Sequence, residues 1–238
     1  MNETSTQTDG RRRWRRGLVL VCAAVIFYSA LLMLVDARGN PSVPSTGGKL
    51  VFQDDFHRAE IGDKYLQGTA DHGHRAGVWK IVDGRLAAEK IHNAGLWLQT
   101  PLPDNVRLEF DVRAESATGD LKCEIFGDGI THQSGYIVIM GGWHNSTNCI
   151  ARQDEHGEDR KNDLRCPRPG NKVTCVEPLV DYRWAIERQG DTVKWFVDDV
   201  LMLTYPDSAP LRGKHFAFNN WEAKVSFDNL AIYDLDSD

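Results

Sequence analysis

The stretch from Ser134 to Arg160 gathers more groups capable of chemistry than any other part of this 238-residue chain. It reads SGYIVIMGGWHNSTNCIARQDEHGEDR. Trp143 follows two glycines, which permit a tight loop that leaves the indole ring exposed. A flat indole can stack on the apolar face of a sugar, and neighbouring polar side chains can bond its hydroxyls. The candidate ligand-binding residues are Trp143, His144, Asn145, Arg152, Asp154, His156 and Arg160.

The same stretch has a second interpretation that involves no ligand. Trp143 could cover the rim of the core, and the charges from Asp154 to Arg160 could form a hydrated turn with local salt links. Asn145-Ser146-Thr147 would also be a glycosylation sequon in a eukaryotic host, and a glycan there would weaken the case for a sugar site. The sequence leaves these interpretations open.

Catalysis on a glycosidic bond would need two carboxyl groups about 5–5.5 Å apart for retention, or about 6.5–9.5 Å apart for inversion. The candidates for acid or base chemistry are Asp154, Glu155 and His156. They stand in a sequence typical of a turn, and a flexible turn positions a catalytic pair poorly. We therefore expect binding rather than catalysis, with a hydrolase acting on glycosidic bonds as the alternative.

The charge distribution argues against nucleic acid as a partner. Of the 28 basic and 34 acidic residues, five and three lie in residues 1–37, which leaves 23 and 31 in the remainder, a net charge of −8. Phosphate binding needs a basic surface. The tract Asp71-His72-Gly73-His74 offers too few ligands to predict a metal site, and we interpret it as a polar loop.

The N-terminal region has the pattern of a membrane anchor. Five arginines between Arg11 and Arg16 precede 18 uncharged residues from Leu18 to Val35, which meets the ~18–20 residues needed to cross a bilayer. Arginines on this side predict a cytoplasmic N-terminus. The run is longer than the ~7–15-residue core of a cleaved signal peptide, although Val35-Asp36-Ala37 offers a possible cleavage site.

The chain is therefore expected to have four segments. They are a cytoplasmic basic tail (1–16), a transmembrane signal-anchor (17–37), a linker rich in proline, serine and glycine (38–48), and a domain (49–238) exported to the periplasm or the cell exterior.

The elements that must position these residues are predicted to be β-strands. Residues 106–112 alternate apolar and charged side chains with the period of a strand. Asp83-Gly84 lies between two such runs and predicts a two-residue hairpin. Residues 225–233 change phase near Asp228-Asn229, as a bulge would require. Many short strands separated by turns indicate an all-β sandwich or barrel.

Four segments resemble, in the correct order, the concanavalin A-like lectin/glucanase superfamily. They are Phe52–Arg58, Trp79–Leu86, Trp184–Asp199 and Val225–Ile232. The sequence is similar in particular to the branch known as 3-keto-disaccharide hydrolase-like. This resemblance implies a jelly-roll sandwich of two antiparallel sheets, ligands on the concave face, and a sugar as the ligand.

The resemblance also implies two features of the site. Related sandwiches hold calcium where the first and last strands meet, so Asp55 and Asp228 are candidate ligands of a structural calcium ion; no other cofactor is expected. These aspartates could instead cap turns. Glucanases of the superfamily carry a Glu-x-Asp-x-x-Glu strand, and this sequence has no such motif, which weakens the case for catalysis.

Four cysteines in the exported region suit an oxidising compartment. We expect a disulfide between Cys166 and Cys175, because the intervening Pro167–Asn171 can turn back on itself. Cys123 and Cys149 would then join two strand regions. Free thiols and zinc ligation are the alternatives, and zinc is disfavoured because no two cysteines form a C-x-x-C pair.

The sequence thus predicts a single-pass membrane protein whose exported concanavalin A-like sandwich binds a saccharide or glycan. Two other functions stay open. One is a glycan-acting hydrolase, and the other is a structural or interaction module of the cell envelope with no small ligand.

Overall fold

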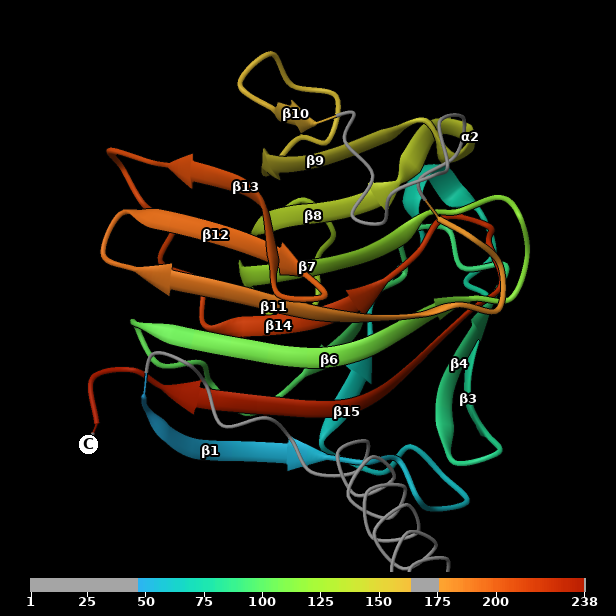
Figure 1. Cartoon of the computed structure of the whole chain (residues 1–238). Coiled ribbons are helices and arrows are strands. Elements are labelled where there is room, and N and C mark those ends of the chain that lie inside the picture. The colour runs from blue at the N-terminus through green and yellow to red at the C-terminus, as the bar shows by residue number, and fades with distance from the viewer. Residues whose placement is uncertain (1–46, 164–175, 238) are drawn as a thin grey trace, which may run out of the picture. The chain divides into compact units, whose positions relative to one another are not determined.

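Two antiparallel sheets account for nearly all the regular structure of the computed structural model, which describes residues 47–163 and 176–237 (Figure 1). In this described part, sheet A has eight strands: β13 (Val200–Pro206), β12 (Thr192–Val197), β11 (Asp181–Gln189), β6 (Val106–Ala114), β15 (Val225–Asp234), β4 (Arg85–Glu89) and β3 (Val78–Val82), with β1 (Lys49–Asp54) beside β15. Sheet B has seven: β10 (Lys161–Asp163), β9 (Thr147–Arg152), β8 (Tyr136–Gly141), β7 (Leu121–Gly127), β14 (His215–Asn219), β5 (Leu96–Leu98) and β2 (Tyr65–Gln67).

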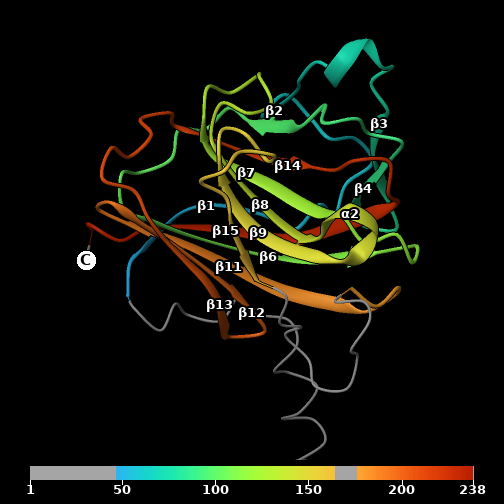
Figure 2. The same cartoon turned by 90° about the horizontal axis from the view of Figure 1, so that it is seen from above.

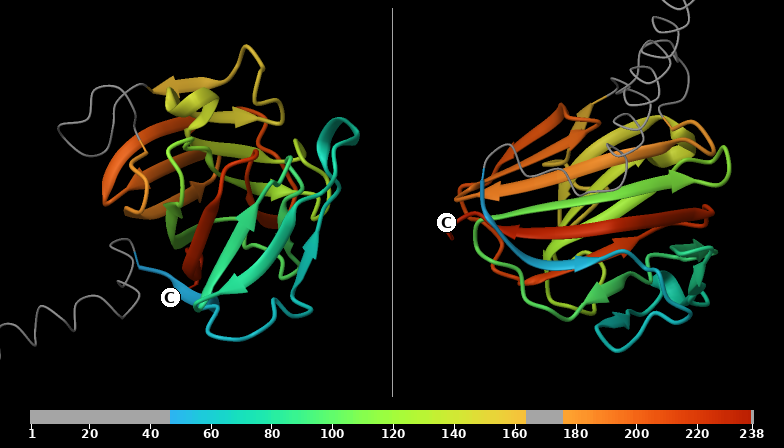
Figure 3. Two further views of the ribbon diagram at one scale, coloured as in Figure 1. Left: turned by 90° about the vertical axis from the view of Figure 1, so that its right-hand side faces the viewer. Right: turned by 60° about the horizontal axis from the view of Figure 1, so that its bottom comes forward.

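The sheets lie face to face as two layers. Figure 1 shows sheet A in front of sheet B, and Figure 2 shows both layers from above. The right-hand view of Figure 3 shows β11, β6 and β15 side by side, although β15 closes the chain. Two one-turn helices, η1 (Asp71–Gly73) and α2 (Gly142–Asn145), are the helical elements of the described chain. The predicted all-β sandwich is confirmed.

Aromatic side chains fill the space between the sheets. Phe218 of β14 lies with its ring centroid 5.5 Å from that of Phe110 on β6 and 4.6 Å from that of Phe227 on β15. These three side chains are fully buried. Because each buried phenylalanine contributes about 1.5–3 kcal/mol, this cluster is a major contact between the layers.

Two local predictions are confirmed. Asp83 and Gly84 have φ of 51° and 74° and join β3 to β4 as the predicted hairpin. The pairing of β15 with β6 shifts register between Asp228 and Ala231, where the sequence predicts a bulge. The first strand begins at Lys49, close to the predicted start of the domain.

The predicted N-terminal tail, the anchor at 17–37 and nearly all of the linker lie outside the described residues. Within 47–163 and 176–237, no helix has the length and apolar character needed to span a bilayer.

One of the two predicted disulfides is wrong. Cys123 and Cys149 are both free and buried. Cys123 on β7 belongs to the core between the sheets, whereas Cys149 on β9 belongs to a patch on the opposite face of sheet B. β8 also separates their strands, and neighbouring strands lie about 4.8 Å apart. The thiols therefore point away from each other, two strands apart. Cys166 and Cys175 lie outside the described residues.

Candidate functional site

A tight left-handed turn carries Trp143 out of sheet B. The backbone φ angles of Gly141, Trp143, His144 and Asn145 lie between 49° and 68°, a region that glycine and asparagine adopt more easily than other residues. A Cβ atom at Gly141 would lie 2.6 Å from atoms of both Asn145 and Val176, so the end of β8 requires glycine.

Asn145 fixes this turn to a distant segment of backbone. Its buried amide donates to the Val176 carbonyl at 2.7 Å and accepts from the Val176 N–H at 2.9 Å. A longer contact of 3.4 Å reaches the carbonyl of Ala117. The side-chain amide of Asn145 is thus hydrogen-bonded to backbone groups. Asn145 stabilises the turn and does not line the cavity described below.

Trp143 is half-buried and held on several sides. It packs on an apolar patch of sheet B formed by Ile137, Ile139, Cys149 and Ala151. The Arg160 guanidinium lies 4.4 Å from the indole centroid, and the His156 ring meets the indole edge-on at 5.6 Å. A cation over an indole contributes about 0.5–2 kcal/mol, so the ring is well fixed in its orientation.

The face of sheet B that points away from the core, here called the outer face, carries unusual charge. On β7, Leu121, Cys123 and Ile125 enter the core, so Lys122 and Glu124 alternate onto the outer face. Both charged side chains are nevertheless buried, at 1% and 0% exposure. Loops from other parts of the chain must therefore cover them.

A cavity of about 620 Å³ opens between these loops and the outer face. Its lining comes from η1, β7, β8 and α2, from the loops before β5, β7 and β8, and from the turns after β9 and before β15. The lining residues are Asp71, His72, Asn93, Thr118, Asp120, Lys122, Gln133, Ile139, Trp143, His144, Glu155, His156, Trp221, Glu222 and Ala223.

Lys122 is the buried cation of this cavity. Its Nζ lies 2.9 Å from Glu155 Oε2, 3.7 Å from Asp120 Oδ1 and 2.9 Å from Asn93 Oδ1. Burial alone would lower the pKa of Lys122, but the charges of Asp120 and Glu155 raise it above its ordinary value. The ammonium therefore stays charged at neutral pH.

The two carboxyl groups beside Lys122 differ in acidity. Burial raises the pKa of Asp120 above its ordinary value, against the opposing charge of Lys122. Burial would also raise the pKa of Glu155, but the Lys122 charge and hydrogen bond lower it below its ordinary value. Two carboxyl groups with pKa values pushed apart are suited to separate acid and base roles.

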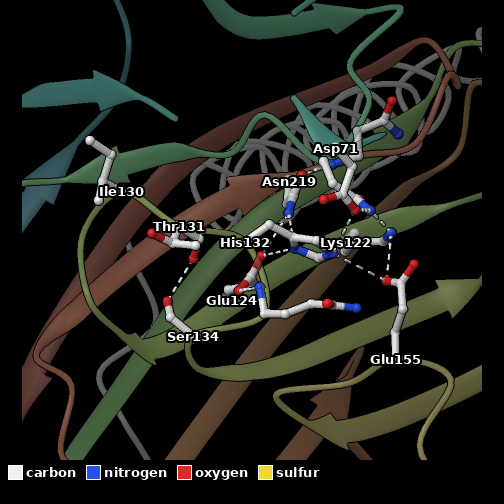
Figure 4. A network of polar contacts seen from close by, with 12 residues as sticks. Asp71, Lys122, Glu124, Ile130, Thr131, His132, Ser134, Glu155 and Asn219 are labelled. Atoms are coloured by element: carbon white, nitrogen blue, oxygen red, sulfur yellow. Dashed lines mark hydrogen bonds and ion pairs between the residues drawn. The ribbon is translucent and has the colours of Figure 1, made fainter. Parts of the chain in front are cut away.

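A second group of buried polar side chains adjoins Asp71 and Glu155 of the cavity lining (Figure 4). His132 Nδ1 contacts Glu124 Oε1, and Asn219 donates to the same oxygen at 2.8 Å. The Gln133 N–H donates to Glu124 Oε2 at 3.1 Å. The other ring nitrogen, His132 Nε2, has no hydrogen-bond partner and lies 3.8 Å from Asp71 Oδ2. The carboxylate thus fixes the orientation of the imidazole.

The sequence-predicted site residues divide into two groups. Trp143, His144 and His156 line the cavity, as does Glu155 from the alternative catalytic set. The structure brings these four residues together, although β9 separates Trp143 and His144 from Glu155 and His156 in the sequence.

The other predicted residues do not line the cavity. Arg152 shares the strand face of core residue Ile150 and donates from Nε to Asp207 at 2.9 Å. Asp154 accepts the His156 N–H at 2.8 Å, which closes a turn. Arg160 donates to the Glu155 carbonyl at 2.6 Å and reaches the site only through its contact with Trp143.

Sequence reasoning missed much of the cavity wall. The lining residues Asp120, Lys122 and Trp221 were not predicted, and Asp71 was interpreted as part of a polar loop. His132, which is buried next to Asp71, was not predicted either. One signal was available, because two charged residues alternate with apolar ones in Lys122-Cys123-Glu124 within a strand that is otherwise apolar.

The two predicted calcium ligands do not form a cluster. Asp55 is exposed and accepts the His57 N–H at 3.1 Å, while Asp228 lies 3.4 Å from Arg85. Among the residues that the structure describes, no group of three histidine, cysteine, aspartate or glutamate side chains is placed to hold a metal ion. The observed donors therefore do not fit a calcium site, and calcium binding stays an untested prediction.

The solved structures similar to this chain include both binding modules and enzymes. The carbohydrate binding module CBM66 from Bacillus subtilis aligns with 71% of this chain and 95% of its own, at a TM-score of 0.55 and 16% identity. The laminarinase from Flavobacterium sp. UMI-01 aligns with 78% of this chain and 100% of its own, at a TM-score of 0.56 and 14% identity. The laminarinase from Rhodothermus marinus aligns with 79% of this chain and 97% of its own, at a TM-score of 0.56 and 16% identity. At this identity the likeness shows the fold alone. The sequence matches no family model and no curated protein.

Proposed function

The chain has the concanavalin A-like jelly-roll fold, and we propose that the cavity on the outer face of its sheet B binds a saccharide. The observation that carries this proposal is the pairing of two indole rings, Trp143 and Trp221, with polar side chains in a single cavity. Its volume of about 620 Å³ falls within the range of small-ligand sites.

The chemistry of the lining suits a sugar. Indole rings offer flat apolar surfaces to the C–H face of a pyranose. Asn93, Asp120 and Lys122 offer hydrogen-bond acceptors and donors to its hydroxyls. The CBM66 structure, which shares the fold, is by its name a carbohydrate binding module. We extend this property to the present chain on the strength of its own cavity.

Binding of the full-length chain, purified in detergent, to a panel of neutral and charged oligosaccharides tests the proposal. Trp143→Ala is expected to weaken the affinity on the order of tenfold, because it removes a stacking surface worth about 0.5–1.5 kcal/mol beyond its area. Leu179→Ala, at an exposed site outside the cavity, is the control and should bind normally. No binding across the panel would favour an interaction module of the envelope instead.

A glycan hydrolase is the second candidate, and one observation favours it. Asp120 and Glu155 flank Lys122 with pKa values shifted in opposite directions. Such a pair can supply a general acid and a general base. Proton transfer by one positioned side chain accelerates a reaction about 10²–10⁴-fold. Two of the similar structures are laminarinases by name. The sequence resemblance to 3-keto-disaccharide hydrolases makes 3-keto-glycosides a second substrate class to examine.

Product release from laminarin, other glycans and 3-keto-glycosides tests this candidate. Glu155→Gln and Asp120→Asn should each abolish turnover, whereas Asp154→Asn should retain it because Asp154 only closes a turn. Binding without turnover of any substrate would reject the hydrolase and leave the binding proposal intact.

We further propose that residues 17–37 anchor the domain in a membrane with the N-terminus in the cytoplasm. The support is the run of 18 uncharged residues behind five arginines. Cell fractionation followed by protease treatment from the outer side tests it. Recovery of the intact chain in the soluble fraction would contradict the proposal.

A further inference from the structure

Two histidine rings contact Trp221 without lining the cavity themselves. The rings of His74 and His92 are stacked, with their centroids 4.5 Å apart and their planes at 13°. The Trp221 indole stands nearly perpendicular to both, with its centroid 5.5 Å from that of His74 and 5.1 Å from that of His92. Edge-to-face contacts of this kind favour one orientation of the rings. The two histidines can therefore fix the orientation of Trp221 without touching a ligand.

The backbone of His92 joins two walls of the cavity. Its carbonyl accepts the Asp71 N–H at 2.8 Å, on the side of η1. It also forms an isolated β-bridge with Trp221, in the turn before β15. The neighbouring Ile91 carbonyl accepts the Glu222 N–H at 2.6 Å. Asp71, Trp221 and Glu222 all line the cavity, so a change at His92 reaches both walls.

The His92 ring lies between two groups that accept hydrogen bonds. Nδ1 lies 3.2 Å from the Arg75 carbonyl oxygen, and Nε2 lies 3.1 Å from Glu222 Oε1. A carbonyl oxygen and an ionised carboxylate can only accept, so both ring nitrogens must donate. A histidine with a proton on each nitrogen is an imidazolium cation. The two contacts thus favour the charged form of His92, whose side chain is 15% exposed.

The segments packed against His92 suit a single positive charge. Among the described residues, their charged or titratable side chains belong to Asp71, His72, His74 and Arg75 in or just after η1, to Glu222, and to Lys90 on the segment of His92 itself. Glu222 supplies the opposite charge, and Arg75 contacts the His92 ring through its carbonyl oxygen. A second proton, on the stacked His74 ring, would repel the first.

We propose that protonated His92 positions Trp221 for saccharide binding and makes that binding depend on pH. The proton allows one ring to bond both Arg75 and Glu222, on the segments that carry Asp71 and Trp221. Histidine changes its charge between pH 5 and 8. When the proton leaves, one of the two hydrogen bonds is lost and the wall that carries Trp221 loosens. Affinity should therefore be high while the proton is bound and fall as the pH rises through this range. This inference rests on the proposed saccharide-binding function and names its regulation.

His92→Phe tests the proposal, because phenylalanine keeps a ring beside Trp221 but has no proton to donate. The probes are glucose hexasaccharides with β-1,3 or β-1,4 linkages, which do not titrate. Calorimetric titration of the full-length parent and variant, in detergent, gives affinities at about pH 6 and about pH 8. The parent should bind about tenfold tighter than the variant at the lower pH and at most about threefold tighter at the higher pH. The lining histidines His72, His144 and His156 titrate in both proteins, so this ratio isolates His92.

Two further variants separate positioning from a general effect on the fold. His57→Phe removes an exposed imidazole outside the cavity and should keep the affinities of the parent at both pH values. In a Trp221→Ala background, adding His92→Phe should change the affinity by less than about twofold at either pH, because the side chain that His92 positions is already absent.

Nitrogen-15 NMR of the histidine rings reads the protonation state without a ligand. The ring signals missing from His92→Phe belong to His92. At about pH 6 both nitrogens should have the chemical shifts of N–H groups, and at about pH 8 one of them should lose its proton. Glu222→Gln, which removes the opposite charge at an exposed site, should move this loss to lower pH and reduce the pH dependence of binding. It replaces His92→Phe in the binding test if that variant does not fold.

The outcomes are distinguishable. A parent-to-variant ratio that is equal at both pH values overturns the inference and leaves saccharide binding standing, because His92 would then act only in the fold. A ratio that still changes with pH in the Trp221→Ala background also overturns it, as does a neutral His92 ring at about pH 6. Failure to bind both hexasaccharides and every other glycan of the panel removes the proposed function together with the inference.

Discussion

Lys122 illustrates how a single residue can organise the candidate site. Its side chain is 1% exposed, and its ammonium lies 2.9 Å from both Glu155 and Asn93. A buried charge is tolerated only when partners compensate it, and the partners here line the same cavity that a ligand would enter. The groups that stabilise Lys122 are therefore also the groups available for function.

Replacing Lys122 with methionine should be strongly destabilising. The substitution leaves Asp120 and Glu155 buried without their cation, and the loss of one partner from a buried pair costs about 3–5 kcal/mol. Urea denaturation of the variant measures the free energy of unfolding. The double variant Lys122→Met/Glu155→Gln removes one orphaned charge and should recover part of the loss. A single variant within about 1 kcal/mol of the parent would mean that water already screens these charges.

The position of each predicted site residue relative to the cavity follows from the face of the strand or turn that carries it. Trp143 and His156 both line the cavity and contact each other, because the chain returns along β9 to the end of α2. Arg152 does not line the cavity, because its strand parity matches that of Ile150 in the core. Successive residues of a strand point to opposite faces, so Cys149 and Ala151 of β9 lie on the outer face, whereas Ile150 and Arg152 point toward the core side.

At the scale of elements, the turn from β8 into α2 is held by one side chain. Asn145 makes two hydrogen bonds to the backbone of Val176 while its own φ is 62°. It thus supplies both the contact and the tolerance of a left-handed conformation. The position of Trp143, two residues earlier, depends on it.

Asn145→Ala should lower the free energy of unfolding by about 2–4 kcal/mol. Two lost hydrogen bonds to buried backbone account for most of this, and alanine strained at positive φ adds the remainder. Asn145→Gly is the matched control, because it loses the same bonds without the strain. It should be about 0.5–1 kcal/mol more stable than the alanine variant by chemical denaturation. Equal stability of the two variants would show that the strain is relieved by local movement.

Strand parity also decides the chemistry of the cysteines. Cys123 and Cys149 point to opposite faces of sheet B, and burial raises the pKa of both thiols, that of Cys149 to about 12. We expect neither to react with a maleimide in the folded chain and both to react after denaturation without reductant. Peptide mapping by mass spectrometry identifies the labelled residues. A Cys123–Cys149 cross-linked peptide would contradict the structure.

At the scale of the whole molecule, the fold was predictable and the cavity was not. Hairpin signals such as Asp83-Gly84 and the alternation in β6 are local, so the sequence displays them directly. The cavity instead joins Asp71, Lys122, Glu155 and Trp221, which the sandwich topology brings together from distant parts of the chain. No pattern within a short window encodes that meeting.

Acid sensitivity is a further property of the whole domain. Among the residues that the structure describes, seven carboxyl groups have pKa values lowered in the folded state by hydrogen bonds or cations, in spite of desolvation, which alone would raise them; they belong to Asp54, Asp104, Glu115, Asp128, Glu155, Asp207 and Asp234. Because their folded pKa lies below the unfolded value, each adds stability that is present above about pH 4 and is lost as the pH falls through the folded pKa. Asp120 and Asp228 have raised pKa values and act in the opposite sense.

Asp207 offers the clearest test of this balance, because it joins separate parts of the sandwich. It accepts from Tyr136 Oη at 2.7 Å, from Arg152 Nε at 2.9 Å and from the Ala209 N–H at 2.9 Å. Asp207→Asn should cost about 1–3 kcal/mol at about pH 6 through the loss of charge-assisted hydrogen bonds. Near pH 3, below the unfolded pKa of about 3.9, part of the stability that the lowered pKa of Asp207 contributes is lost, so the difference between the two urea midpoints should shrink. Asp63→Asn, at an exposed site, is the control and should follow the parent at both pH values. If Asp207→Asn lowered the free energy of unfolding equally at both pH values, Asp207 would stabilise the domain through packing and not through its carboxylate charge.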